Sequence, residues 1–380
     1  MSADQPVHRL VATRLILLGG FLGAGKTTTL LRLARHWTSL GRRVGIITND
    51  QGENLVDTGM FRAAALDTAE VAGGCFCCRF DDFVARADDL LERFDPDVIL
   101  AEPVGSCTDL VATVIEPLGR LHAGRFEIAP YTVLVDPIRV LQTFGGRGGV
   151  SLSEKITYIY RMQQVEAQCL AVNKCDLLSE ADRLVVDALL EERFPNVPRF
   201  VFSARTGEGF EPLINELESR AIDAISANNP PSVDYAIYRE GESELAWLNT
   251  SLELSAANPI DIDGALVALA EYVRHTLVAG LLAVGHVKLL ARTTTGTAVA
   301  NITRDDAPAE LSQPTGAAST SLALVANLRV AGDPLALHHA WLGAFDTWAN
   351  EWGVEVVEGT GQCFKPSPPA PPPQKQRVGA

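Results

Sequence analysis

The sequence lacks several features that would assign it to a common class of protein. No apolar run is long enough to cross a bilayer, since even LVAGLLAVG at 277–285 falls far short. The first ten residues, MSADQPVHRL, lack the charged and then apolar pattern of a secretory signal. Positive charge is in deficit: 32 Lys and Arg residues face 47 Asp and Glu residues, and the net charge of −15 disfavours nucleic acid or an anionic membrane as the main partner. These absences predict a cytoplasmic protein whose seven cysteines are reduced.

The length of 380 residues and the order of the apolar segments predict two domains. From residue 14 to about 226, apolar runs typical of strands buried on both faces alternate with helical stretches. We expect strands at 14–20, 43–48, 97–102, 131–136, 169–173 and 199–204, and helices at 25–39, 82–94, 107–118, 151–167, 180–193 and 209–225. This alternation predicts an α/β domain with a doubly wound, mostly parallel sheet over residues 10–226.

The second domain follows a segment of turn residues, from which we predict a linker at 227–234. Strands are then expected at 245–255, 284–293, 297–303, 320–330 and 354–359, with helices at 262–280 and 334–352 and a loop at 305–318. That order predicts a smaller α+β, ferredoxin-like domain over residues 235–362. Residues 363–380 are rich in proline and are expected to form a disordered tail.

The segment GGFLGAGKTTTL carries the P-loop pattern, Gly20-x4-Gly25-Lys26-Thr27, between a predicted strand and a predicted helix. Glycines let backbone N–H groups turn toward phosphate oxygens, and the helix N-terminus adds partial positive charge. Lys26 is expected to reach the β- and γ-phosphates, and the Thr27 hydroxyl is expected to bind Mg²⁺. The nucleotide-binding residues predicted in this segment are Gly20, Gly23, Ala24, Gly25, Lys26, Thr27 and Thr28.

Two later strand ends predict that the base is guanine. The sequence VNKCD contains Asn173-Lys174-x-Asp176, and a carboxylate at Asp176 can accept hydrogen bonds from the ring N–H and the amine of guanine. Adenine would face this carboxylate with a lone pair, and an unpaired buried acceptor costs about 1–3 kcal/mol, which selects GTP over ATP. Asn173 is expected to tie the loops together and the Lys174 stem to lie over the base. In SARTGEG, the backbone of Ser203 and Ala204 is expected to meet guanine O6.

Acidic residues follow two other strands. Glu102 ends the run DVILAE, where a carboxylate orders the Mg²⁺ shell or its water. In TNDQGEN, Asp50 and Glu53 are expected near the γ-phosphate, on a switch loop that responds to the nucleotide. Asp50 is a candidate to orient the attacking water, with Gln51 as the weaker alternative, and Lys26 and Glu102 complete the predicted catalytic set.

Three cysteines, Cys75, Cys77 and Cys78, lie within four positions behind two glycines in VAGGCFCCRF. Such a thiol cluster selects Zn²⁺ or a competitor such as Co²⁺ or Ni²⁺. No second CxxC and no clear His pair completes a four-ligand site, so an open site that holds metal transiently is favoured over a structural one. Buried packing and a redox pair remain alternatives for these thiols. His286 is a further candidate to face the metal from the second domain.

Together, GGFLGAGKTTTL, TNDQGE, GGCFCC, ILAEPVG and VNKCDLL resemble the CobW-type GTPases, relatives of the HypB and UreG proteins. The resemblance covers the first domain and implies GTP hydrolysis coupled to delivery of a transition metal. It implies Cys75, Cys77 and Cys78 as metal ligands, with Glu53 as a further candidate. The chain departs from the family pattern at Asp50 and Gln51 and lacks a His-rich loop, which marks a divergent member.

We therefore expect a GTPase that uses GTP and Mg²⁺ and serves as a metallochaperone or metal insertase for a client metalloprotein. The alternatives are a GTPase that activates a cofactor-dependent enzyme, such as a corrinoid enzyme, without carrying free metal, a small-molecule phosphotransferase, and a thiol–disulfide protein. The sequence leaves open the native metal, the client and whether the chain forms a homodimer.

Overall fold

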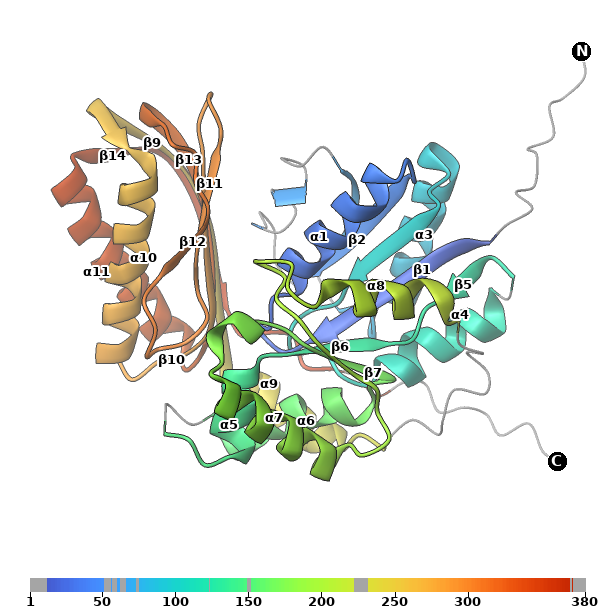
Figure 1. The fold of residues 1–380 in the computed structure, drawn as a ribbon. Coiled ribbons are helices and arrows are strands. Elements are labelled where there is room, and N and C mark those ends of the chain that lie inside the picture. The colour runs from blue at the N-terminus through green and yellow to red at the C-terminus, as the bar shows by residue number, and fades with distance from the viewer. Residues whose placement is uncertain are drawn as a thin grey trace, which may run out of the picture.

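The computed structural model describes residues 12–50, 56, 60–61, 66–72, 75–122, 124–148, 152–221, 232–369 and 371. Two sheets organise this part of the chain, one in the first half and one in the second. Figure 1 shows them side by side, with the second sheet standing against one side of the first domain.

The first sheet is parallel in all its described pairings and has the strand order β3-β2-β4-β1-β6-β7-β8, with β5 beside β1. Its strands are β1 (Thr13–Gly20), β2 (Val44–Asp50), β3 (Asp67–Ala72), β4 (Val98–Glu102), β5 (Phe126–Ile128), β6 (Thr132–Val135), β7 (Cys169–Val172) and β8 (Arg199–Val201). The predicted doubly wound parallel sheet is confirmed. The sequence prediction missed β3 and β5, because β3 (DTAEVA) is short of large apolar residues and β5 has only three residues.

Helices cover both faces of this sheet. They are α1 (Lys26–Ser39), α3 (Phe80–Phe94), the π-helical turn η1 (Val111–Ile115), α4 (Glu116–Leu121), α5 (Pro137–Phe144), α6 (Glu154–Val165), the 3₁₀ turn η2 (Cys175–Leu177), α7 (Glu180–Arg193) and α8 (Phe210–Ser219). Alternate residues of a strand point to opposite faces. Leu15 and Leu17 of β1 accordingly pack against α3 and α6, while Ile16 and Leu18 pack against α1 and α8.

Most predicted helices are present, with different ends. The helix expected from 107 begins at Val111, and the helix expected to reach 225 ends at Ser219. The prediction missed α5, although its start is encoded locally: Pro137 occupies the first turn, and the Asp136 side chain accepts a hydrogen bond from the Ile138 amide.

The second sheet is antiparallel, with the order β12-β11-β10-β13-β9-β14. Its elements are β9 (Leu245–Asp261), α10 (Ile262–Ala279), β10 (Ala283–Arg292), β11 (Thr297–Ile302), β12 (Glu310–Gln313), β13 (Ala318–Ala331), α11 (Pro334–Trp352) and β14 (Val354–Phe364), preceded by α9 (Tyr235–Ser243). The order β10-β13-β9-β14, with two helices on one face, is the expected ferredoxin-like arrangement.

Three details of the second half correct the sequence prediction. Strand β12 lies within 305–318, which we predicted to be a loop, and it pairs with β11 at the sheet edge. Helix α9 was not predicted, although the Asp234 side chain caps it. The last strand continues to Phe364, because Cys363 and Phe364 pair with Leu248 and Trp247 of β9.

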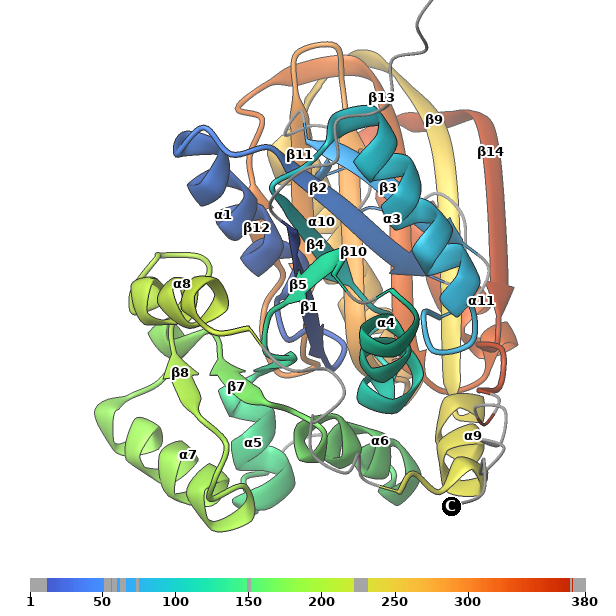
Figure 2. The same ribbon diagram turned by 90° about the vertical axis from the view of Figure 1, so that its right-hand side faces the viewer.

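The two faces of the second sheet have different partners. Leu248, Val287 and Leu328 point to the face covered by α10 and α11. The opposite face is turned toward the first domain (Figures 1 and 2), where Trp247 joins the α3–α6 core and Leu290 joins the α1–α8 core. The hydrophobic cores are thus continuous between the halves, which fixes the second sheet against the loops of the first.

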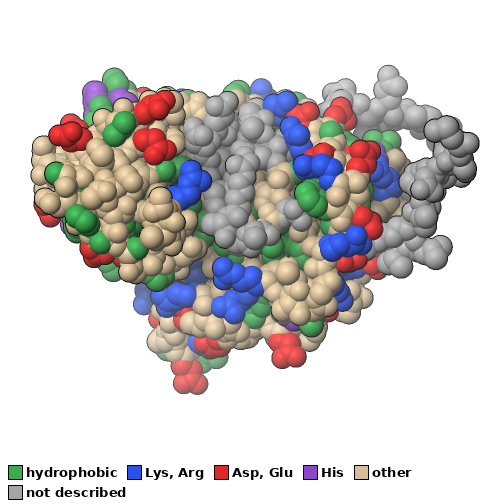
Figure 3. Space-filling model, turned by 90° about the horizontal axis from the view of Figure 1, so that it is seen from above, with side chains coloured by type: hydrophobic (Ala, Val, Ile, Leu, Met, Phe, Trp, Pro, Cys, Tyr) green, Lys and Arg blue, Asp and Glu red, His purple; other side chains and the backbone are tan. Residues whose placement is uncertain are grey.

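Charged side chains of both signs are visible on one face of the molecule. In the view from above (Figure 3), acidic and basic side chains are interspersed over the face that is seen. None of the described helices combines the length and the apolar character needed to cross a membrane.

Candidate nucleotide and metal site

The predicted site residues follow different strands of one parallel sheet. In such a sheet the carboxyl ends of all strands meet at the same edge. The P-loop follows β1, Glu102 ends β4, Asn173 follows β7 and Ser203 follows β8. Because Cys75 follows β3, the unpredicted strand brings the cysteine loop to this edge as well.

The P-loop is shaped by left-handed glycines. Gly25 has φ +93° and precedes α1, and a Cβ there would lie 2.3 Å from Nδ2 of Asn173, so only glycine fits beside that side chain. Gly23 has φ +78°, and a Cβ there would lie 3.1 Å from the carbonyl oxygen of Gly285 in the second sheet. Lys26 is buried and donates to the Gly20 carbonyl oxygen at 2.9 Å. The loop therefore has the backbone of a phosphate cradle and is closed on one side by β10.

Asn173 links two loops, as its motif predicts. Its Nδ2 donates to the Ala24 carbonyl oxygen at 2.9 Å, and its Oδ1 accepts from the Ala204 amide at 2.8 Å. The Ser203 amide donates to the Glu208 carbonyl oxygen at 2.8 Å. The two amides expected to meet guanine O6 therefore already donate within the protein, and their contribution here is to hold the loop.

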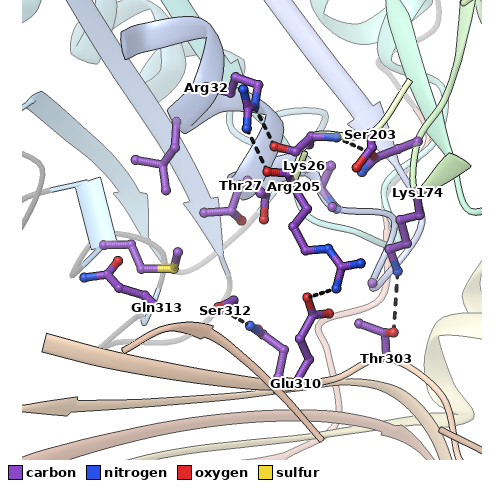
Figure 4. A pocket seen from close by; sticks show the side chains of 18 of the residues that line it. Lys26, Thr27, Arg32, Lys174, Ser203, Arg205, Thr303, Glu310, Ser312 and Gln313 are labelled. Carbon is purple, nitrogen blue, oxygen red and sulfur yellow. Dashed lines mark hydrogen bonds and ion pairs between the residues drawn. The ribbon is translucent and has the colours of Figure 1, made fainter. Parts of the chain in front are cut away.

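Asp176, the carboxylate predicted to read the base, is paired with a cation in the structure. Asp176 Oδ2 accepts from Arg205 at 2.5 Å, and Arg205 also donates to Glu310 of β12 at 3.0 Å (Figure 4). Nearby, Lys174 donates to Asp136 at 2.7 Å and to Thr303 at 3.4 Å. Burial opposes ionisation of Asp136, but the Lys174 ammonium and other groups outweigh it and lower the pKa of this carboxyl.

These loops line one cavity of about 580 Å³. The first domain contributes residues of the P-loop region and of two later loops: Gly23, Gly25, Lys26, Thr27, Thr28, Asn173, Asp176 and Ala204. The second sheet contributes residues of β10, β11 and β12. Figure 4 shows the second sheet as the floor beneath the P-loop residues. The cavity is large enough for a small ligand and lies on the helix N-terminus, where anions are stabilised.

Thr27 and Glu102, the two residues predicted to hold Mg²⁺, lie together at one end of the cavity. Thr27 Oγ1 donates to Glu102 Oε1 at 3.1 Å and accepts from Lys288 Nζ at 2.9 Å. A hydroxyl and a carboxylate are hard oxygen donors of the kind that Mg²⁺ prefers, so these residues fit that ion. Bound there, Mg²⁺ would supply charge for the phosphates.

Cationic side chains converge on the cavity from both halves. Lys26, Lys174 and Lys288 all line it, and His286 lies beside them. Burial, followed by the charges of Lys288, Lys174 and Lys26, holds the pKa of His286 well below its usual value. Among the described residues, His286 is not grouped with the cysteines, so the structure gives no support to its candidate role as a residue that faces the metal.

Three candidates cannot be placed. Gln51 and Glu53 lie outside the described residues, and Asp50 is described only as the last backbone position of β2, opposite Ala72 of β3. Their predicted roles in hydrolysis and metal binding stay predictions.

The cysteine cluster lies at the edge of the sheet. The Sγ atoms of Cys75, Cys77 and Cys78 are within 4.8 Å of one another, close enough for one metal ion. Cys75 is buried and Cys78 is exposed. Cys75 and Cys77 form a disulfide, whereas we expected reduced thiols, and Cys78 Sγ lies 3.4 Å from that of Cys75. The cluster suits a metal only when the disulfide is reduced, because thiolates are the ligands.

One side chain connects this loop with the nucleotide end of the sheet. Asn49 of β2 is buried, and its Oδ1 accepts from the Phe76 amide at 2.9 Å, between Cys75 and Cys77. The preceding residue, Thr48, is the register partner of Glu102 in β4. Strands β3 and β1 are three strand spacings apart, roughly 14 Å, so the cysteines and the P-loop are connected through β2 and β4.

Sequence reasoning missed the contribution of the second half of the chain, above all Lys288, Thr303 and Glu310, the last of which accepts from Arg205 of the first domain. A signal was present in β10. His286 and Lys288 alternate with the apolar Val287 and Leu289, a period of two that turns both polar side chains to one face. The sequence did not reveal that this face meets the P-loop.

The fold and the site define a P-loop nucleotide-binding protein with a ferredoxin-like second domain. Residues 14–198 match the profile of the CobW/HypB/UreG nucleotide-binding domain. The chain therefore carries a nucleotide-binding domain of the CobW/HypB/UreG family.

Two curated relatives and one solved structure are similar to it. The chain is 28% identical to the zinc chaperone CobW of Sinorhizobium sp over 219 residues, 50% of this chain and 59% of that protein. It is 34% identical to the zinc chaperone YeiR of Escherichia coli over 94 residues, 24% and 28% of the two chains. These matches thus span less than two thirds of the relatives' length. HypB from Helicobacter pylori, solved in complex with nickel, is 17% identical with a TM-score of 0.41, covering 58% of this chain and 92% of that one.

Proposed function

We propose that this chain binds and hydrolyses GTP and uses the nucleotide state to control a transition metal held by Cys75, Cys77 and Cys78. The metal would be delivered to a client metalloprotein, and the cytoplasm, with its reduced thiols, is the compartment in which this chemistry would operate. The observation that carries the proposal is the hydrogen bond from the Phe76 amide to Asn49.

The nucleotide part of the proposal rests on the cavity. The triphosphate would lie on the Gly23–Gly25 backbone with Lys26 beside it, and Thr27 with Glu102 would hold Mg²⁺. Asp176 would read guanine once the base competes with Arg205 for its oxygens. Several relatives named zinc chaperones make zinc the first metal to test.

The coupling part rests on strand β2. A change around the terminal phosphate would act on the end of β2, which lies between β4 and β3. Because Asn49 is fixed in that strand and accepts a hydrogen bond from the cysteine loop, a displacement of the strand end changes the positions of the Sγ atoms. The metal site would then differ in affinity between the two nucleotide states.

The proposal predicts that zinc affinity, measured under reducing conditions, differs between the GDP-bound protein and the protein bound to a non-hydrolysable GTP analogue. Replacing Cys75, Cys77 and Cys78 by Ser should abolish high-affinity binding, whereas the buried Cys107→Ser variant should retain it. Asn49→Ala should retain GDP binding and zinc binding but lose the difference between nucleotide states.

Equal zinc affinity in both nucleotide states would refute the coupling. Client activation that survives in the triple Ser variant would favour the alternative, a GTPase that activates a cofactor-dependent enzyme without carrying free metal. Phosphate release from GTP without an added acceptor would separate hydrolysis from phosphotransfer.

A further inference from the structure

The residue that carries a further inference is Lys288, in β10 of the second sheet. Its Nζ lies 2.9 Å from Oγ1 of Thr27, the P-loop hydroxyl. The contact joins residues 261 positions apart in the sequence. A cation from the second domain thus occupies the end of the cavity where Thr27 also donates to Glu102.

The position of the Lys288 backbone is fixed on both sides of the strand. Lys288 is the register partner of Asn301 in β11 and of Asn327 in β13. Gly285 lies at the β-bulge of the same strand, and a Cβ there would be 2.9 Å from Leu22 Cδ1 of the P-loop region. This close approach holds β10 against the P-loop. The strand can therefore stay in place while the long, flexible Lys288 side chain turns from Thr27 to another partner.

The charges around Lys288 favour a polyanion in the cavity. Lys26, Lys174 and His286 are its neighbours there, and the Lys174 ammonium is already paired with Asp136. A cation bound by Thr27 and Glu102 needs the oxygen lone pair that Lys288 contacts, and two like charges at this separation repel. The ammonium would then turn toward the nearest anion, and in a P-loop site that anion is the terminal phosphate, which a diphosphate lacks.

The same polar face contacts Val56, which follows β2 in the chain. Asn327 Oδ1 accepts from the Val56 amide at 2.8 Å, and Val56 is fully buried in a core shared with Leu290 and Val299. Asn327 is the cross-strand neighbour of Lys288. One face of the second sheet therefore contacts both the P-loop and Val56.

We propose that Lys288 is a phosphate-sensing residue supplied by the second domain, which exchanges its contact with Thr27 for one with the terminal phosphate of bound GTP. The second sheet would thereby distinguish the triphosphate from the diphosphate. This inference rests on the proposed binding of GTP and extends it to a residue outside the matched family domain.

The test is a comparison of affinities by fluorescence titration with labelled GDP and a labelled non-hydrolysable GTP analogue in Mg²⁺. Lys288→Met should weaken binding of the triphosphate analogue about tenfold or more, as expected for a charge-assisted hydrogen bond, and change GDP binding little. Lys288→Arg should retain most of the preference. The exposed Lys365→Met variant is the matched control and should behave as wild type.

A Lys288→Met protein with the wild-type ratio of the two affinities would overturn the proposal. An equal loss for both nucleotides would also overturn it, because Lys288 would then only support the P-loop. If Lys288→Met fails to fold, Lys288→Gln replaces it with a polar side chain of similar length. If the wild-type protein binds neither guanine nucleotide, the proposed function itself fails, which the same titration reveals.

Discussion

Replacing Asn173 tests whether the nucleotide loops are held together as the structure indicates. Asn173 is 2% exposed and bonds the Ala24 carbonyl and the Ala204 amide, which are themselves in buried residues. Asn173→Ala would leave both backbone groups without this partner, at about 1–3 kcal/mol for each group. Since water from the adjacent cavity can recover part of the loss, we expect the free energy of unfolding to fall by about 2–4 kcal/mol.

Urea denaturation of the nucleotide-free protein measures this loss, and calorimetry with GDP measures a second consequence. The P-loop and the base-side loop would no longer be joined, so the affinity for GDP should fall as well. Asn215→Ala, at an exposed position of α8, is the matched control and should change stability by less than about 0.5 kcal/mol. An Asn173→Ala protein as stable as this control would show that the two loops do not depend on Asn173.

Three further predictions concern other residues. Burial raises the pKa of Glu242 from 4.5 to about 8. Between these pH values the folded state retains a proton that the unfolded state releases. The free energy of unfolding therefore falls as pH rises, by about 1.4 kcal/mol per pH unit. Urea titrations should therefore show Glu242→Gln more stable than wild type at pH 8, with a smaller difference at pH 5; equal differences would contradict this. Zinc binding should require a reductant, since the Cys75–Cys77 disulfide removes two of three thiolate donors, and undiminished binding to the oxidised protein would exclude this ligand set. Asp176→Ala should lower the preference for GDP over ADP about tenfold or more in calorimetry, whereas an unchanged preference would mean that another group reads the base.

Much of the first domain could be predicted because its signals are local. The P-loop pattern, the strand before it and the helix after it lie within about thirty residues, and each buried strand is a continuous apolar run. Asn173 and Asp176 follow such a strand, and the rule that parallel strands end at one edge places them beside the P-loop. The prediction that Asn173 ties loops together agrees with its hydrogen bonds to the Ala24 carbonyl and the Ala204 amide.

Strand β3 could not be predicted from local signals. Its sequence, DTAEVA, has no strong periodicity, and it becomes a strand because β2 offers an unpaired parallel edge. Without β3 the cysteines have no fixed position relative to the nucleotide site. The hydrogen bond from the Phe76 amide, between Cys75 and Cys77, to Asn49 is likewise a tertiary contact between positions 27 residues apart.

The sequence alone determined the P-loop pattern, the Asn173-Lys174-x-Asp176 pattern, the thiol cluster and the order of a parallel before an antiparallel sheet, because each of these signals lies in neighbouring residues. The tertiary structure decided that the polar face of the second sheet covers the cavity, with Lys288 on Thr27 and Glu310 on Arg205. The alternation of polar and apolar residues along β10 indicates that one face of the strand is polar, but it does not show which part of the protein that face contacts. The position of this face is set by the apolar contacts of Trp247 and Leu290 with the two cores of the first domain, because burial of these side chains fixes how the two sheets pack.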